Sequence, residues 1–223
     1  MVNYYPVFLD IRRMPCLVVG GGSVAERKVE LLLECGAAVT VVSPRCTDRL
    51  RQLACQERLS LVERSYEHKD LRSAGLVIAA TDSHATNAEI AQQARTRGLM
   101  VNAVDDPDLC TFLAPAIVRR GDLTVAISTG GRSPALARYA REQIEQLFPP
   151  GYEQVIDQMS HLRQRLRSAV PAGQARERVW RALMADGLVE LLRAGAWDEV
   201  ERQVGRALAE MTKATPTADR DND

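Results

Sequence analysis

Short apolar runs alternate with longer amphipathic stretches over the first half of the chain. The apolar runs predict five strands, at residues 15–19, 38–42, 60–64, 75–80 and 99–103. A helical periodicity between most of these runs predicts helices at residues 23–35, 46–57 and 84–97. Strands that alternate with helices form a parallel sheet with helices on both faces. We therefore expect an α/β fold in this half of the chain.

The pattern changes after residue 110. Residues 116–127 predict two strands around a turn at 120–122, and a helix of about residues 134–147 follows, with Ser133 as its N-cap and Pro134 as its first residue. The pattern then stays helical to about residue 212, and the last residues are polar. We expect an α/β domain, a hairpin-and-helix segment, a helical domain and a disordered tail, at residues 1–113, 114–149, 150–212 and 213–223.

The first predicted strand ends in a glycine-rich turn. Gly20, Gly22 and Ala25 match the pattern G-x-G-x-x-G/A. In this pattern the first glycine permits a tight turn, the second lets the backbone approach a pyrophosphate, and the small third residue lets the helix pack on the strand. The N–H groups and the dipole at the helix start favour the diphosphate charge. The strand–turn–helix context predicts a dinucleotide-binding domain of the Rossmann type, and a βα turn without a ligand is the alternative.

The turn after the second predicted strand contains no acidic residue. In many NAD-binding domains an Asp or Glu at this place binds the ribose hydroxyls. Here Ser43 could bind the ribose and Arg45 could face a phosphate, which leaves both NAD and NADP open; alternatively, Ser43 and Pro44 only form a turn. Thr81 follows the fourth strand and is expected beside the nicotinamide, because ligands bind at the carboxyl ends of parallel strands.

Two adjacent carboxylates follow the fifth predicted strand. Asp105 falls at the crevice expected to hold the nucleotide, where a partly dry environment can make a carboxylate a proton acceptor or donor. We predict that Asp105 is catalytic and that Asn102 touches the cofactor or orients a neighbour. Asp106 precedes Pro107, so we expect it to bond the backbone of an Asp-Pro turn.

A glycine-rich loop at residues 128–134 leads into the predicted helix at 134–147. Its N–H groups and Arg132 could meet an anionic substrate, which predicts substrate contacts at Thr129, Gly130, Arg132 and Ser133. The alternative is a plain strand-to-helix connection whose glycines permit unusual φ values.

Composition narrows the class of protein. The chain has 223 residues, a formal net charge of zero and 46% hydrophobic residues, as in an ordinary globular protein. A neutral balance argues against nucleic acid as the main partner. Five cysteines without a C-x-x-C pair and three scattered histidines predict neither a disulfide framework nor a bound metal. No apolar stretch approaches the roughly 20 residues that span a bilayer, and the N-terminus has no signal-peptide pattern, so we expect a cytoplasmic protein.

Five stretches of the chain together resemble the precorrin-2 dehydrogenases and the N-terminal half of the sirohaem synthases. They lie in the family's order within about residues 4–150, at residues 5–9, 19–28, 79–82, 101–107 and 128–138. The resemblance implies an NAD-dependent oxidoreductase that converts precorrin-2 to sirohydrochlorin. In bifunctional relatives it also implies a ferrochelatase, a lyase for which Fe²⁺ is a substrate.

The resemblance also implies roles for particular residues. It places NAD contacts at Ser23, Val24, Pro44 and Arg45, and it matches Asp105 to the family's essential aspartate. The family shares the missing ribose acid, which favours NAD over NADP. The hairpin and helix within residues 114–149 would form an intertwined homodimer. Thr129 stands beside a serine that is modified in some relatives, and because this chain has threonine there, we infer no modification.

Two other functions stay open on the sequence alone. Some stand-alone relatives only oxidise precorrin-2, and residues 152–212 are the least diagnostic part of the chain. A non-catalytic regulatory module that senses NAD also pairs a glycine turn with dimerisation, although such modules usually keep an acid after the second strand.

Overall fold

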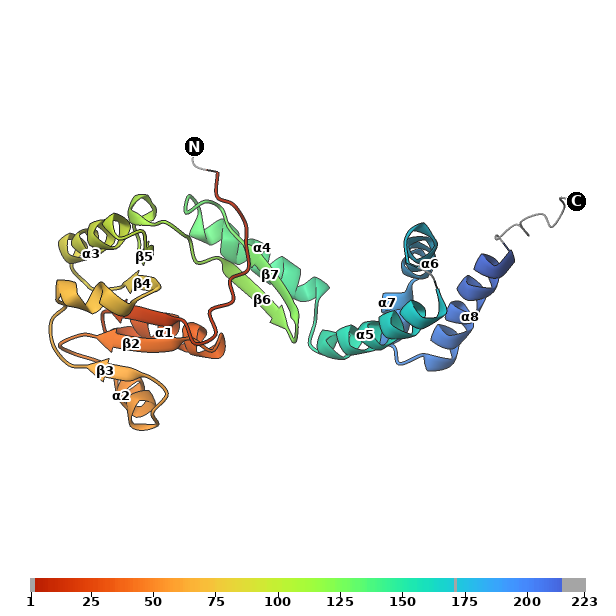
Figure 1. The fold of residues 1–223 in the computed structure, drawn as a ribbon, viewed down its shortest axis with the longest axis horizontal. Coiled ribbons are helices and arrows are strands. Elements are labelled where there is room, and N and C mark those ends of the chain that lie inside the picture. The colour runs from red at the N-terminus through yellow and green to blue at the C-terminus, as the bar shows by residue number, and fades with distance from the viewer. Residues whose placement is uncertain (1–2, 171, 214–223) are drawn as a thin grey trace, which may run out of the picture. The chain divides into compact units, whose positions relative to one another are not determined.

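A five-stranded parallel sheet forms the centre of the first part of the chain. The computed structural model describes residues 3–170 and 172–213 (Figure 1). The strands follow the order β3-β2-β1-β4-β5 across the sheet, and all neighbouring pairs are parallel. The five predicted strands and their parallel arrangement are thus confirmed, as β1 (Pro15–Val19), β2 (Ala38–Val42), β3 (Ser60–Val62), β4 (Leu76–Ala79) and β5 (Met100–Ala103).

Helices cover both faces of this sheet. Successive side chains of a strand point to opposite faces. Val18 of β1 therefore packs in the core beneath α1 and α2, whereas Leu17 packs in the core beneath α3. The α-helices of this part are α1 (Ser23–Glu34), α2 (Asp48–Cys55) and α3 (His84–Thr96), and the short 3₁₀ helices are η1 (His68–Ser73) and η2 (Pro107–Leu109).

The strand order reverses at β1, which lies between β2 and β4. Such a reversal opens a crevice at the carboxyl ends of the strands, where ligands bind in this class of fold. Backbone hydrogen bonds continue past the strand ends at this place: Ala80 N donates to Val19 O at 2.8 Å, and Val104 N donates to Ala79 O at 2.9 Å. The segments that follow β1, β4 and β5 are thereby brought together at one edge of the sheet.

The chain divides into two compact units. Among the described residues, the first contains 3–115 and 128–137, and the second contains 116–127 and 138–213. In the second unit the two hairpin strands pair antiparallel, and the last four helices share one apolar core. Its elements are β6 (Ala116–Arg120), β7 (Leu123–Ile127), α5 (Tyr152–Ala169), α6 (Gln174–Ala185), α7 (Leu188–Arg193) and α8 (Trp197–Lys213), while α4 (Pro134–Leu147) begins in the first unit and continues in the second.

The second half of the chain also has the predicted elements. The hairpin, the helix at 134–147 and the helical region after residue 152 are all present. The predicted disordered tail at 213–223 lies outside the described residues, except for Lys213 at the end of α8. The domain boundaries drawn from the sequence stay a prediction. No helix in the described ranges is long and apolar enough to cross a membrane.

Candidate functional site

The glycine turn after β1 has the geometry that the sequence pattern predicts. Gly20 has a φ of +120°, and a Cβ there would lie 2.2 Å from the backbone oxygen of Ala80. Gly22 directly precedes α1, and a Cβ there would meet nothing within 4 Å. The first glycine is therefore required by the fold itself. The second leaves open space in front of the N–H groups of a helix start, as a bound pyrophosphate requires.

Gly21 is also required, which the sequence pattern did not indicate. A Cβ at Gly21 would lie 2.3 Å from the backbone oxygen of Arg45 and 2.6 Å from Sγ of Cys46. The backbone oxygen of Gly21 accepts a hydrogen bond from Thr47 N at 3.0 Å. The segment after β2 thus rests directly on the glycine turn, and a side chain between them would separate the two walls of the site.

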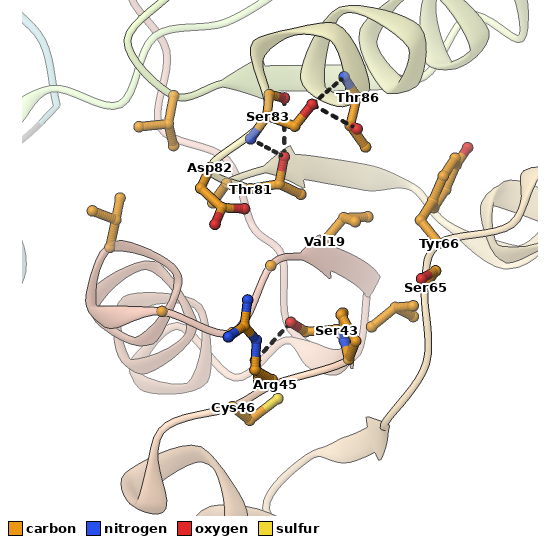
Figure 2. A pocket seen from close by; sticks show the side chains of 18 of the residues that line it. Val19, Ser43, Arg45, Cys46, Ser65, Tyr66, Thr81, Asp82, Ser83 and Thr86 are labelled. Atoms are coloured by element: carbon orange, nitrogen blue, oxygen red, sulfur yellow. Dashed lines mark hydrogen bonds between the residues drawn. The ribbon is translucent and has the colours of Figure 1, made fainter.

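A cavity of about 970 Å³ opens above this turn, at the carboxyl ends of β1, β2 and β4 (Figure 2). Its volume is within the range of cofactor sites. Its walls come from the glycine turn, the segments after β2, β3, β4 and β5, and the first turns of α3. The lining residues are Val19–Val24, Val42–Thr47, Ser65, Tyr66, His68, Ala80–Ser83, Thr86, Glu89, Val104 and Asp105.

The segment after β2 offers both a hydroxyl and a cation. Ser43 is 6% exposed, and its Oγ donates to the backbone oxygen of Arg45 at 2.7 Å. The hydroxyl thus closes the turn, as one interpretation of the sequence proposed, and its oxygen keeps lone pairs that can accept a hydrogen bond. The Arg45 guanidinium points into the space between Ser43 and Asp82 (Figure 2). No residue between Ser43 and Thr47 is acidic.

Thr81 lies at the cavity wall, but its backbone N–H and its hydroxyl are hydrogen-bonded to another residue of the protein. Oδ1 of the buried Asn87 accepts hydrogen bonds from Thr81 N at 3.1 Å and from Thr81 Oγ1 at 2.7 Å. Ser83 is the N-cap of α3, because its hydroxyl accepts from Thr86 N at 3.2 Å. The segment after β4 is therefore held firmly against α3, and Thr81 shapes the wall of the site.

Asp105 is brought to the same cavity by the turn after β5. The bond from Val104 N to Ala79 O carries the chain across the end of β4, and Asp105 follows with a φ of +63°. Its carboxylate has no hydrogen-bond partner among the described residues. It interacts with the charge of Lys28 on α1. Burial lowers the pKa of Lys28, the neighbouring Arg27 lowers it further, and Cys110 and Asp105 act in the opposite direction.

Asn102 does not lie at the cavity that the other predicted cofactor residues line. It is buried, it does not line the cavity, and its amide donates to Phe112 O at 3.1 Å and to Cys110 Sγ at 3.3 Å. Its side chain is held on the inner side of β5 because strand residues alternate between faces. Of the two roles the sequence suggested, the structure therefore supports the orientation of a neighbour rather than contact with the cofactor.

The glycine-rich loop at 128–134 lies against the loop that carries Asp105. A Cβ at Gly131 would come within 2.7 Å of Cγ of Pro107. The Thr129 hydroxyl accepts from Ser133 N at 3.1 Å and donates to Ser133 O at 3.0 Å, and Ser133 begins the next helix as expected. Arg132 is exposed and has no partner among the residues that the structure describes. A free cation thus lies in a loop that packs on the turn two residues after Asp105.

Several lining residues were not predicted. Cys46, Thr47, Ser65, Tyr66 and His68 follow β2 and β3, and Thr86 and Glu89 belong to α3. Burial raises the pKa of Tyr66 to about 12, so its hydroxyl stays protonated and donates to Gln93 Oε1 at 2.6 Å. The rule that ligands bind beyond the carboxyl ends of parallel strands applies to the third predicted strand as well and could have indicated Ser65 and Tyr66.

Within residues 3–170 and 172–213, no three His, Cys, Asp or Glu side chains converge as a metal site would require. The donor set of the cavity instead fits a dinucleotide. It combines open backbone N–H groups at a helix start, a cation at Arg45 and hydroxyl groups along the walls.

We expect Arg45→Ala to weaken the affinity for NAD by about ten-fold or more, because it would remove the charge-assisted contact that we predict between this guanidinium and a phosphate oxygen. Isothermal titration of the purified chain with NAD measures this. Arg58→Ala is the matched control, since Arg58 is an exposed arginine of the same domain that does not line the cavity. An unchanged affinity in Arg45→Ala would show that the guanidinium does not face the bound dinucleotide.

Three family profiles match successive regions of the chain. Residues 7–116 match a family described as NAD(P)-binding, residues 120–147 match the central region of sirohaem biosynthesis proteins, and residues 151–208 match the sirohaem synthase dimerisation region. The last description falls beyond the dimerisation segment at 114–149 that the sequence predicts, so the boundaries of that segment stay a prediction.

Known proteins with similar sequences are named sirohaem synthases. The chain is 42% identical over 201 residues to a sirohaem synthase of Methylococcus capsulatus. The aligned region covers 90% of this chain and 42% of that protein. It is 36% identical over 219 residues to a sirohaem synthase of Nitrosomonas europaea. This aligned region covers 98% of this chain and 46% of that protein. The chain thus spans somewhat less than half the length of these relatives.

A solved structure shows the same fold. "SirC, precorrin-2 dehydrogenase" superposes with a TM-score of 0.71 at 24% sequence identity, over 94% of this chain and all of that one. The NAD(P)-binding match and the glycine turn with its cavity agree on the cofactor, which is a nicotinamide adenine dinucleotide. Two of the three matched regions, residues 120–147 and 151–208, carry sirohaem descriptions, and the chain is similar to sirohaem synthases over 90% of its own length or more.

Proposed function

We propose that this chain oxidises precorrin-2 to sirohydrochlorin with NAD as the cofactor. One observation carries the proposal: Asp105 and the glycine turn, more than 80 residues apart in the sequence, line the same cavity. A dinucleotide seated on Gly20–Gly22 would therefore have a carboxylate beside it. The similarity of the chain to proteins named sirohaem synthases supports the substrate class.

The oxidation removes two electrons and two hydrogens from the tetrapyrrole. Bound NAD supplies the hydride acceptor. The second hydrogen leaves as a proton, and the carboxylate of Asp105 accepts it. Asp105 is available for this role because no described side chain donates a hydrogen bond to it. Lys28 provides a nearby cation from α1.

The glycine-rich loop at 128–134 supports an anionic substrate. Precorrin-2 carries many carboxylates, and a guanidinium binds a carboxylate with two parallel hydrogen bonds. Arg132 is exposed and has no partner in the described part of the chain, and its loop packs on Pro107 through Gly131. We propose that Arg132 binds a substrate carboxylate and that the N–H of Gly130 and the side chains of Thr129 and Ser133 shape the loop for this contact.

NAD rather than NADP is the proposed cofactor. The Ser43 hydroxyl donates its hydrogen bond to Arg45 O, and its oxygen can accept a hydrogen bond from a ribose hydroxyl. Ser23 and Val24 at the start of α1, and Pro44 and Arg45 in the segment after β2, line the cavity, and the resemblance described above implies NAD contacts at these four residues. A lower KM for NAD than for NADP would support this assignment.

Ferrous-iron insertion into sirohydrochlorin is the second proposed reaction. A chelatase must remove the pyrrole protons as the metal enters, and Asp105 could accept them as well. Fe²⁺ would be a substrate in this step.

The match of residues 151–208 to a dimerisation region supports a homodimer.

An absorbance assay with enzymatically generated precorrin-2 and NAD, followed by Fe²⁺, tests both reactions on the whole chain. NADH formation with a sirohydrochlorin spectrum, then a metallated spectrum, is the expected result. Oxidation that stops at sirohydrochlorin would leave a dedicated dehydrogenase and refute the chelatase proposal. Binding of NAD without any turnover would refute the enzyme and favour an NAD-sensing module.

A further inference from the structure

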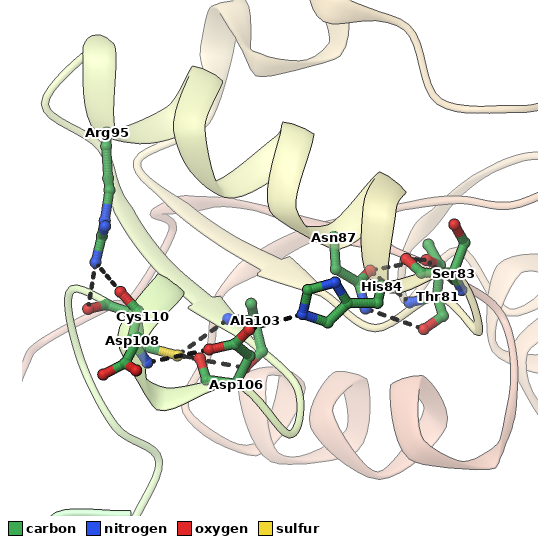
Figure 3. A network of polar contacts seen from close by, with 9 residues as sticks. All are labelled: Thr81, Ser83, His84, Asn87, Arg95, Ala103, Asp106, Asp108 and Cys110. Atoms are coloured by element: carbon green, nitrogen blue, oxygen red, sulfur yellow. Dashed lines mark hydrogen bonds and ion pairs between the residues drawn. The ribbon is translucent and has the colours of Figure 1, made fainter.

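Helix α3 contacts the loop that carries Asp105 at two separated points (Figure 3). At its first residue, Nε2 of His84 lies 2.8 Å from Oδ2 of Asp106. In its last turn, the Arg95 guanidinium donates to Asp108 O at 2.6 Å and to Cys110 O at 3.1 Å. His84 and Arg95 stand eleven positions apart (95 minus 84), which is about three helical turns, so they lie on one face of α3.

The loop is also tied to β5 from within. The Cys110 thiol accepts from Ala103 N at 3.2 Å and lies 3.2 Å from Asp106 O. Burial raises the pKa of this thiol, which therefore stays protonated and can donate. Asp106 Oδ1 accepts from Asp108 N at 3.2 Å. The residues on both sides of Asp105 are thus fixed by neighbours, whereas Asp105 itself makes no hydrogen bond through its side chain among the described residues.

Asp105 has a backbone conformation that needs such support. Its φ of +63° lies in the left-handed region, which costs a non-glycine residue roughly 1 kcal/mol. A relaxed backbone would turn the carboxylate to another direction. The bond from Val104 N to Ala79 O supports the residue before Asp105, and the pair of His84 with Asp106 supports the residue after it from a different element.

We propose that His84 and Arg95 are positioning residues, which hold the 104–110 loop so that Asp105 faces the cavity. This rests on the proposed function for its catalytic consequence. Neither side chain needs to touch the substrate, because both act through the loop. Since a carboxylate only accepts, Nε2 of His84 carries the proton of the bond. The same hydrogen bond lowers the pKa of Asp106, which keeps the acceptor ionised.

A surface ion pair without a role in catalysis is the competing explanation. The His84 side chain is 77% exposed and Asp106 is 23% exposed, so the pair contributes little to global stability. The two explanations therefore differ in what they predict. An incidental pair leaves both the loop and catalysis unchanged, whereas a positioning pair lowers kcat with little change in the melting temperature.

The test uses His84→Ala and Arg95→Met in the full chain. We expect amide hydrogen exchange in peptides covering residues 104–110 to become at least about ten-fold faster. We expect kcat for precorrin-2 oxidation to fall by about ten- to a hundred-fold, as misplaced catalytic groups do, while KM for NAD stays unchanged. His84→Gln retains an N–H donor for Asp106 and should recover most of the loop protection and most of kcat.

Two controls and a double variant complete the experiment. Arg97→Met changes an exposed arginine two residues from Arg95, and His161→Ala changes an exposed histidine of α5; neither should alter loop exchange or kcat. His84→Ala combined with Asp106→Ala should lose no more activity than Asp106→Ala alone, because the two side chains act as one pair.

Unchanged loop exchange in both His84→Ala and Arg95→Met would overturn the proposal, and so would faster exchange with wild-type kcat. If the wild-type chain does not oxidise precorrin-2, the proposed function fails. The exchange data, which need no activity, still decide in that case whether these side chains hold the loop.

Discussion

Asp105→Asn should lower kcat for precorrin-2 oxidation by about 10²- to 10⁴-fold, which is the usual contribution of a positioned general base. Asparagine has nearly the same shape and tolerates the left-handed backbone conformation of this position, where φ is +63°. The fold and the affinity for NAD should therefore stay as in the wild type. Parallel measurement of NADH formation and of NAD binding separates the loss of the base from a loss of structure.

Asp157→Asn is the control for this experiment, because it makes the same chemical change on an exposed residue of α5. Asp105→Ala is less informative, since alanine would add backbone strain to the loss of the carboxylate. Turnover near the wild-type rate in Asp105→Asn would show that another group accepts the proton. Fe²⁺ insertion measured on the same variant would then show whether the two reactions share one carboxylate.

Gly20→Ala should lower the free energy of unfolding by more than about 3 kcal/mol, which is among the larger effects of single substitutions. The new methyl group would lie 2.2 Å from Ala80 O, a backbone atom that the sheet holds in place, and φ at this position is +120°. Neither the strand end nor the turn can move without breaking the bond from Ala80 N to Val19 O. Urea unfolding followed by circular dichroism measures the change.

Gly22→Ala is the matched variant and should behave differently. A Cβ at Gly22 meets nothing within 4 Å, and φ there is −83°, so we expect a loss of at most about 1 kcal/mol from the poorer helix N-cap. The methyl group would point into the space that a pyrophosphate must enter. NAD affinity should therefore fall at least ten-fold, about 1.4 kcal/mol, in a protein that is still folded. Wild-type stability in Gly20→Ala, or wild-type affinity in Gly22→Ala, would contradict this division of roles.

The strands and helices of the first unit followed closely from the sequence. Apolar runs mark strands that are buried on both faces, and the helical periodicity between them marks the crossover helices. The glycine turn was recognisable because its geometry is local: a tight turn and a helix start depend on residues close in sequence. Asp105 was recognisable because it stands directly after a strand whose carboxyl end had to face the crevice.

Other parts of the site were not visible in this way. The need for glycine at Gly21 comes from Arg45 and Cys46, which approach it from the segment after β2. Tyr66 reaches the cavity from the segment after β3, and Asn102 donates to Cys110 and does not line the cavity. Each of these facts depends on which strands are neighbours and on which face a strand residue points to.

By itself the sequence determined the order of the strands and helices, the dinucleotide turn at Gly20–Gly22 and the carboxylate at Asp105, because each follows from periodicity or from residues within one turn. Only the tertiary structure decided that His84 meets Asp106 across 22 positions and that Arg95 reaches the backbone of Asp108. A periodic pattern indicates which face of a helix is buried, but a polar contact made by a side chain at the surface leaves no periodic trace. It depends on the packing of α3 beside β5, which places one face of the helix along the loop.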